Sequence, residues 1–273
     1  MNIEMSKNNY KYEIIEILNT ITVDNYKEIL KKLSNIVYKI NDSQKINLDI
    51  LLDNQFQFSE IIIEKAIMEK GYAKLYAKIC YDLYLIYGKL INKFRNNKLK
   101  DSENLQSLLI SECKQKFNDY QYNKNNINEN EYDYLIKKKF LGNINFICEL
   151  IDVKLFSQKI GFEFLDILFK NYKNNSGTDS FDIKNKNLNL EGAITLLNKF
   201  GKIVFEEKIE KFLQDLDYYM KECTIPILND MNDKNIPGYL KYKIINLKEK
   251  QKNNWKESMF EKSILAKGKN NEL

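Results

Sequence analysis

The sequence predicts an all-α fold built from about five antiparallel helical hairpins. Apolar residues recur at steps of three and four through most of the 273 residues, which is the period of an amphipathic helix. The chain has only 9 glycines and 2 prolines, too few for the many tight turns of a β-sandwich or barrel. With 44% hydrophobic and 30% charged residues, it can bury a core beneath a hydrated surface.

The clearest helix is predicted over 72–95, where Tyr76, Cys80, Leu83 and Tyr87 form one apolar stripe. The same spacing predicts ten helices in order, over 10–18, 23–40, 45–69, 72–95, 102–119, 131–153, 157–172, 188–200, 203–222 and 238–254. Paired helices recurring every ~35–45 residues match the repeat length of HEAT-type solenoids, in which each hairpin packs against its neighbours. A HEAT-like α-solenoid is therefore the predicted architecture.

Polar, Asn-rich segments interrupt this pattern at 96–98, 122–130 and 171–187, and loops are predicted there. None is long or proline-rich enough to indicate a domain linker. We therefore predict one domain over residues 1–255. The hydrophobic period fades after Trp255, which predicts a polar C-terminal tail over 256–273.

Two residues are predicted to mark helix ends. Thr22 precedes the helix over 23–40, where its hydroxyl can accept a hydrogen bond from a first-turn amide as an N-cap. Gly201 follows the helix over 188–200 and is predicted to end it in the left-handed conformation.

The composition argues against an enzyme. The sequence contains no histidine, which excludes Ser-His-Asp triads, Cys-His pairs and His-ligated zinc. The two glycine-rich phosphate-binding motifs, G-x-G-x-x-G and G-x-x-x-x-G-K-[ST], are both absent from the sequence. The nearest paired carboxylates, Glu206-Glu207 and Asp215/Asp217, are predicted to lie on the solvated side of an amphipathic helix. No catalytic residue, metal site or cofactor is expected.

The cysteines indicate a reducing compartment. The chain has four, Cys80, Cys113, Cys148 and Cys223, none in a Cys-x-x-Cys motif, and each lies within an apolar helical pattern. Buried free thiols are the expected state. No apolar run approaches the ~18 residues of a membrane span, so we expect no membrane association and a cytoplasmic location.

The charge suggests a weak attraction to RNA. The formal net charge is +5 and almost all of the positive charge is lysine, which suits loose binding to backbone phosphates. Candidate RNA-binding residues are Lys137, Lys138 and Lys139, and Lys241 and Lys243 in the last helix. The alternative is that each cluster is only a solvated helix face.

Six blocks of sequence occur in an order found in one known family. They are LNTITVDNY (18–26), IEKAIME followed by YAKIC (63–69 and 76–80), LISECKQKF (109–117), KFLGNINFICEL (139–150), EGAITLLNKFGK (191–202) and YLKYKIINLK (239–248). These blocks resemble the middle domain of eukaryotic initiation factor 4G, the MIF4G domain, over about residues 10–255. The most specific is 139–150, which resembles Arg-x-Leu-Gly-Asn-Ile-x-Phe-Ile-Gly-Glu-Leu.

The resemblance implies a HEAT-like scaffold without enzymatic activity. In that family the domain clasps both lobes of a DEAD-box RNA helicase, speeds its ATP cycle and contacts RNA. It implies a translation-initiation module with three kinds of partner: a helicase of the initiation-factor 4A type, mRNA and other initiation factors. The alternatives are a splicing, decay or stand-alone adaptor of the same superfamily, and a decoy that occupies the helicase without activating it.

The expected helicase-binding residues lie at the two ends of the predicted solenoid. They are Asn19, Thr22 and Asn25 in the first hairpin, and Asn246 and Lys248 in the last helix. The rival interpretation of Asn19 and Thr22 is local turn and cap chemistry. Asn235-Ile236-Pro237-Gly238 replaces the family's Ser-Arg-Ile-Arg, so two arginines are missing.

The segment Tyr12–Leu18 (YEIIEIL) is similar to the helix that docks on the cap-binding initiation factor, although Ile17 replaces a leucine. The same apolar spacing equally predicts packing within the first hairpin.

Overall fold

The computed structural model describes residues 2–42, 48–94, 104–120, 129–174, 180–224, 227 and 235–256. The regular secondary structure of these residues is entirely helical, which confirms the predicted all-α, HEAT-like fold. The described residues up to Ser157 form one compact unit, and those from Gln158 onward form a second. The predicted loop at 96–98 and tail residues 257–273 lie outside the described residues, as does most of the predicted loop at 122–130.

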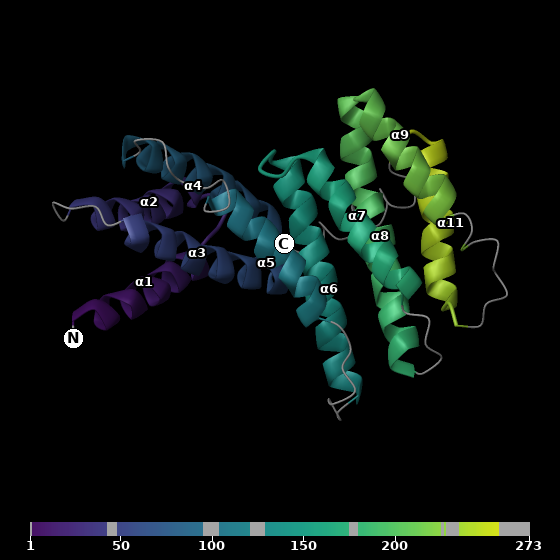
Figure 1. The fold of residues 1–273 in the computed structure, drawn as a ribbon, viewed down its shortest axis with the longest axis horizontal. Coiled ribbons are helices and arrows are strands. Elements are labelled where there is room, and N and C mark those ends of the chain that lie inside the picture. Colours follow the sequence, from purple (N-terminus) through teal and green to yellow (C-terminus); the bar gives the residue numbers. More distant parts are fainter. Residues whose placement is uncertain are drawn as a thin grey trace. The chain divides into compact units, whose positions relative to one another are not determined.

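The first unit is built around α3 (Figure 1). Its elements are α1 (Asn2–Asn19), α2 (Tyr26–Asp42), α3 (Leu48–Met68), the short 3-10 helix η1 (Lys70–Tyr72), α4 (Ala73–Phe94), α5 (Leu105–Asp119) and α6 (Glu129–Asp152). Helix α3 packs against α1, α2, α4, α5 and α6. Apolar side chains such as Phe58, Ile62 and Ile63 are fully buried along it, so one helix supplies much of this core.

The helices of this core approach closely at Gly142 of α6. A Cβ atom at this position would lie 2.3 Å from the backbone oxygen of Ile67 in α3, so only glycine permits the contact. The neighbouring Asn143 is fully buried and donates from Nδ2 to the carbonyl oxygen of Cys113 in α5 at 2.9 Å. The block over 139–150 therefore holds α6 against two other helices.

The second unit contains the remaining helices of the described chain. They are α7 (Gln158–Asn174), α8 (Ser180–Glu207), α9 (Glu210–Tyr218), the π-helical turn η3 (Tyr219–Thr224) and α11 (Gly238–Lys252). Helix α8 packs against α7, α9 and α11 (Figure 1). Its buried residues include Leu196, Leu197 and Phe200.

Helix α8 corrects two predictions. The segment 171–187 was predicted as a loop, but α7 continues to Asn174 and α8 begins at Ser180. Gly201 was predicted to end a helix, but α8 runs through it and ends only at Glu207, before Lys208, which has a φ of 54°. The reason for glycine at 201 is close packing, because a Cβ atom there would lie 2.3 Å from Cη2 of Trp255.

Trp255 reaches Gly201 because of the way α11 ends. The N–H of Trp255 donates to the oxygen of Lys250 at 2.8 Å, and the N–H of Asn254 donates to the oxygen of Gln251 at 3.1 Å. With Asn254 at a φ of 56°, this pattern is a Schellman motif, which turns the chain back against the helix. The Trp255 side chain is consequently buried against α8.

Three of the four cysteines are buried free thiols, as predicted: Cys80, Cys113 and Cys148. Burial raises the pKa of the Cys80 and Cys113 thiols, which keeps them protonated and unreactive at neutral pH. The side chain of Cys223 lies outside the described part of the chain.

Candidate functional site

The turn between α1 and α2 holds Thr22 and Asn25 in a reciprocal cap. The N–H of Asn25 donates to Oγ1 of Thr22 at 3.2 Å, and the N–H of Thr22 donates to Oδ1 of Asn25 at 2.7 Å. This arrangement is a capping box with Asn in the place of Glu or Gln, but it closes the turn over 23–25, because α2 begins only at Tyr26 and not at residue 23 as predicted. Asn25 also donates from Nδ2 to the oxygen of Thr20 at 2.6 Å. Both side chains are thus used to shape the turn.

Asn19 lies at the end of α1 and links it to α3. Its Oδ1 accepts a hydrogen bond from Nζ of Lys65 at 2.8 Å, and Lys65 also pairs with Glu69 at 2.7 Å. The Tyr76 hydroxyl of α4 donates to Glu69 as well. This network fixes the end of α1 against two neighbouring helices.

The turn nevertheless presents an apolar residue to solvent. Val23 lies between the two capping residues and is 75% exposed. A β-branched apolar side chain held outward by a hydrogen-bonded turn can contact a partner without reordering. The first-turn surface is therefore Val23 together with the turn that Thr22 and Asn25 hold.

Helix α11 buries one face and leaves the other exposed. Leu240, Ile244 and Leu247 are fully buried on the side that packs against α8. Outside that face α11 carries three exposed hydrophobic residues at steps of three, Tyr239, Tyr242 and Ile245. Tyr242 is 60% exposed. These three residues, with the exposed Asn246, form the α11 surface.

The lysines of α11 have different environments. Lys243 pairs at 2.6 Å with Glu191 of α8, whose side chain is only 3% exposed. Tyr239 donates from its hydroxyl to the other carboxylate oxygen of Glu191 at 2.8 Å. Lys241 and Lys248 lie on the same side of the helix as Ile245, four residues before it and three residues after it. The α11 surface therefore has lysine along one edge, while the charge of Lys243 is balanced within the fold.

The three successive lysines of α6 do not form one patch. Neighbouring residues of a helix point about 100° apart, so Lys137, Lys138 and Lys139 face different directions. Lys139 lies over the Tyr120 ring, 5.4 Å from its centroid, and of the three only Lys138 is exposed.

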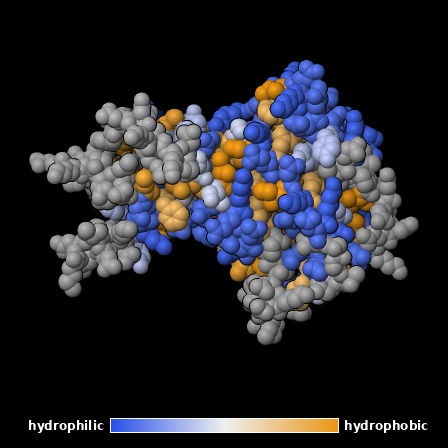
Figure 2. Space-filling model, viewed as in Figure 1, coloured by the Kyte–Doolittle hydropathy of each residue, from blue (hydrophilic) through white to orange (hydrophobic). Residues whose placement is uncertain are grey.

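Two features of the surface were missed by sequence reasoning. Val23 lies within the block over 18–26 and Tyr242 within the block over 239–248, but neither was singled out as a contact residue. Both could have been found because neither fits the helical period of the buried residues beside it. Hydrophilic residues cover most of the face drawn in Figure 2, and hydrophobic residues interrupt them in several places.

Chemical sites are sparse in the described part of the chain. Among those residues, no three His, Cys, Asp or Glu side chains gather in a metal-binding arrangement. None of the described helices combines the length and the hydropathy of a membrane span. Glu206 and Glu207 are exposed at the end of α8, whereas Asp215 and Asp217 belong to α9.

The burial of Leu18 distinguishes the two interpretations of Tyr12–Leu18, which were docking on a cap-binding factor and packing within the first hairpin. Leu18 is fully buried and Ile14 nearly so, whereas Tyr12 is exposed. The apolar positions of this segment therefore pack within the first hairpins.

The described residues form an all-helical repeat fold, and its two candidate surfaces lie on a turn and on one face of a helix. Residues 11–254 match the MIF4G domain family, and the chain belongs to it. This confirms the resemblance found in the sequence, and the match extends over both compact units. MIF4G domains are generally non-catalytic scaffolds that bind RNA-related helicases and other proteins.

One curated relative is a von Willebrand factor A domain-containing protein of Dictyostelium discoideum. It is 23% identical to this chain over 238 residues. The match covers 87% of this chain and 10% of the relative, so the chain spans about a tenth of that protein's length.

Proposed function

We propose that this chain is a translation-initiation scaffold module that binds a DEAD-box RNA helicase of the initiation-factor 4A type and stimulates its ATPase cycle. The α11 surface carries the proposal. Its two exposed tyrosines and Ile245 stand on a helix anchored by its buried face, which is the arrangement expected of a preformed protein interface. Membership of the MIF4G family supports a helicase as the partner.

The first-turn surface is the second proposed contact. It lies in the first compact unit and the α11 surface in the second, and a DEAD-box helicase has two lobes. We assign one lobe to each surface. Val23 supplies the apolar contact of the first, while Asn19, Thr22 and Asn25 hold it in place. At the second, Asn246 and Lys248 contribute hydrogen bonding and charge beside Tyr242 and Ile245.

Contact with mRNA is proposed to be weak and directed at the phosphate backbone. Lys138 is the best placed of these candidates because its side chain is exposed, whereas Lys243 is paired with Glu191 and Lys139 lies over Tyr120. Lys241 of α11 is proposed as a second contact. Lys137 is partly exposed on another side of α6. We further propose that residues 1–255 act as one domain, that other initiation factors also bind it, and that it acts in the cytoplasm.

The first test measures helicase affinity without RNA. Tyr242→Ala removes the most exposed ring of the α11 surface, and we expect binding to weaken about fivefold or more, as for a central interface tyrosine. Lys248→Glu should weaken binding and change its salt dependence. Tyr134→Ala is the matched control, because it removes a similarly exposed tyrosine from α6 in the other unit. Equal affinities for all three variants and the wild type would refute the placement.

The second test separates the scaffold from its rivals. The RNA-stimulated ATPase rate of the helicase is measured with increasing amounts of the chain. A saturating rise is expected for an initiation scaffold. A fall would indicate a decoy or an inhibitory adaptor. An unchanged rate with no complex on a sizing column would refute helicase binding altogether.

A further inference from the structure

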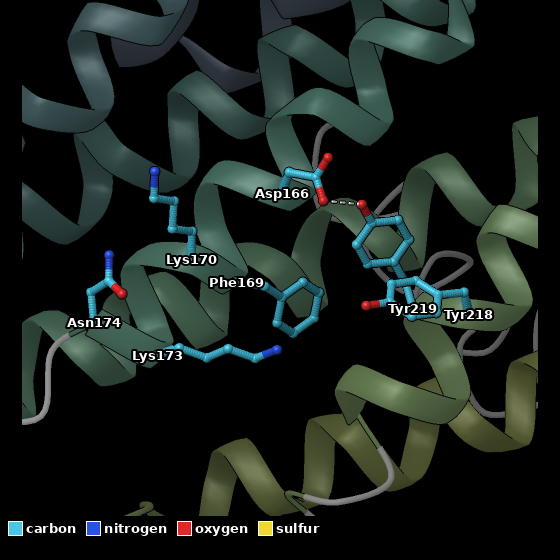
Figure 3. Close-up of a pocket in the computed structure, with 7 residues that line it drawn as sticks. All are labelled: Asp166, Phe169, Lys170, Lys173, Asn174, Tyr218 and Tyr219. Carbon is cyan, nitrogen blue, oxygen red and sulfur yellow. Dashed lines mark hydrogen bonds between the residues drawn. The ribbon is translucent and has the colours of Figure 1, made fainter.

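A small pocket lies between α7 and the end of α9, on a part of the second unit that the proposed function does not use. Its volume is about 230 Å³. Helix α7 supplies one face of it at steps of three and four, from Asp166 through Phe169 and Lys173, and Tyr218 and Tyr219 close the other side (Figure 3). Two structural elements therefore form the pocket by packing together.

The floor of the pocket is aromatic and held in place. Tyr219 is buried and stacks on Phe169, with ring centroids 5.8 Å apart and planes 19° from parallel. It stacks equally closely on Phe162, at 5.8 Å and 16°. The Tyr219 hydroxyl donates to Asp166, as the dashed line in Figure 3 marks. With two rings stacked on it and its hydroxyl bonded, Tyr219 is a rigid floor.

The rim of the pocket is basic and open to a partner. Lys170 and Lys173 are exposed, and neither forms an ion pair with another described residue. Figure 3 shows the Lys173 side chain extending past the Phe169 ring toward the tyrosines. Asn174 adds an amide, and the half-exposed Tyr218 stands edge-on to Tyr219 at 5.3 Å. Figure 3 draws the two ammonium groups apart, with that of Lys170 extending away from the tyrosines, so the two lysines would pair with two separate anionic groups.

The size of the pocket selects among anionic ligands. Pockets for cofactors and other small molecules are typically about 300–1,000 Å³, so a volume near 230 Å³ suits a single side chain. Single-stranded RNA stacks its bases on open ring faces, but Phe169 and Tyr219 are buried and only Tyr218 is half-exposed. A peptide does not depend on such stacking, because one apolar side chain can fill the pocket while carboxylates on either side of it reach the two separate lysines.

We propose that this pocket binds a short acidic segment of a partner protein, with one aromatic or leucine side chain seated on Phe169 and flanking Asp or Glu residues on Lys170 and Lys173. The site is independent of the two proposed helicase-binding surfaces. It therefore gives the scaffold a third contact, for a partner recognised through a linear motif.

The test selects peptides on the whole chain. A phage-displayed library of random dodecapeptides is panned against the wild type, and the best binder is synthesised with a fluorescein label. We expect acidic sequences with one aromatic or leucine residue. We also expect K170E/K173E to lower the affinity at least roughly tenfold, with weaker binding at higher salt. Tyr218→Ala, which leaves the charge unchanged, should also weaken binding.

The control variant is K159E/K202E, which makes the same change in net charge at exposed lysines of α7 and α8 outside the pocket. It should bind the peptide as the wild type does, and circular dichroism verifies that all variants remain helical. Peptides without acidic enrichment would overturn the proposal, as would equal loss of affinity in both double variants. Labelled decauridylate is measured in parallel. If K170E/K173E abolished its binding while peptide binding persisted, the pocket would be an RNA site instead.

Discussion

Replacing Gly142 with alanine tests whether the contact between α6 and α3 restricts this position to glycine. The added Cβ atom would lie 2.3 Å from the Ile67 oxygen and 3.0 Å from its carbonyl carbon, whereas ordinary contact begins at 3.4 Å. Both neighbours are backbone atoms of a buried helix, so the clash cannot be relieved by rotating a side chain. The helix backbones must move apart by about 1 Å within a close-packed core.

The expected change in the free energy of unfolding follows from two opposing contributions. Overpacking costs about 1–3 kcal/mol. Because the neighbouring atoms here belong to the backbone, we place this site at the upper end, at about 3 kcal/mol. Alanine is better than glycine inside a helix by about 1 kcal/mol. We therefore expect Gly142→Ala to destabilise the protein by about 2 kcal/mol. Gly88 of α4 is the matched control, because no atom lies within 4 Å of its added Cβ, and Gly88→Ala should stabilise by up to about 1 kcal/mol.

Urea unfolding followed by helix circular dichroism measures both variants. Because both glycines lie within helices of the first unit, the shared gain in helix propensity cancels in the comparison. The expected difference of about 3 kcal/mol corresponds to roughly 6–12 °C in Tm for a domain of this size. A Gly142→Ala variant as stable as Gly88→Ala would refute the argument from the Ile67 contact.

Three further predictions concern the turn, a helix end and an ion pair. Asn25→Ala removes both side-chain hydrogen bonds of the cap and should cost about 1 kcal/mol in thermal unfolding, whereas Val23→Ala should change stability by less than about 0.5. Lys208→Gly relieves the positive φ at the end of α8 and should raise stability by about 0.5–1 kcal/mol, with a Tm increase as the readout. Burial raises the pKa of Glu64, but its hydrogen bond and ion pair with Lys116 outweigh burial and lower it. That pair should therefore stabilise the fold above the unfolded carboxyl pKa of about 4.3, with the effect lost as pH falls through the lower folded pKa. Because Glu64 is partly exposed, the effect should stay below about 1 kcal/mol, and Glu64→Gln should remove it from a pH series of unfolding curves.

The helical core could be predicted because burial leaves a periodic signal. Tyr76, Cys80, Leu83 and Tyr87 were assigned to one buried stripe, and each is at most 2% exposed in α4. The beginning of α8 gave no such signal, because residues 180–187 are rich in asparagine and lysine. Contacts from outside the segment hold it there, including the bond from Asn187 to the Asn235 oxygen at 3.0 Å. Tertiary contacts thus override low helix propensity.

The sequence pointed to the first turn and the last helix, but it did not indicate which of their side chains are exposed. Asn25 and Thr22 were chosen as polar residues of a turn, and they do shape it, but the exposed group beside them is Val23. The lysines of α11 were treated as one cluster, whereas the buried Glu191 draws Lys243 away from Lys241. Neither outcome is visible locally, since Glu191 lies about fifty residues earlier in the chain.

The packing of Trp255 on Gly201 links two positions that are 54 residues apart in the sequence. Any side chain at 201 would occupy the space of the indole ring, and any smaller residue at 255 would leave a cavity beside α8. Neither position can therefore change freely while the other stays as it is. Among related sequences with the same helix end, we expect substitutions at these two sites to occur together, with a larger residue at 201 accompanied by loss of the tryptophan.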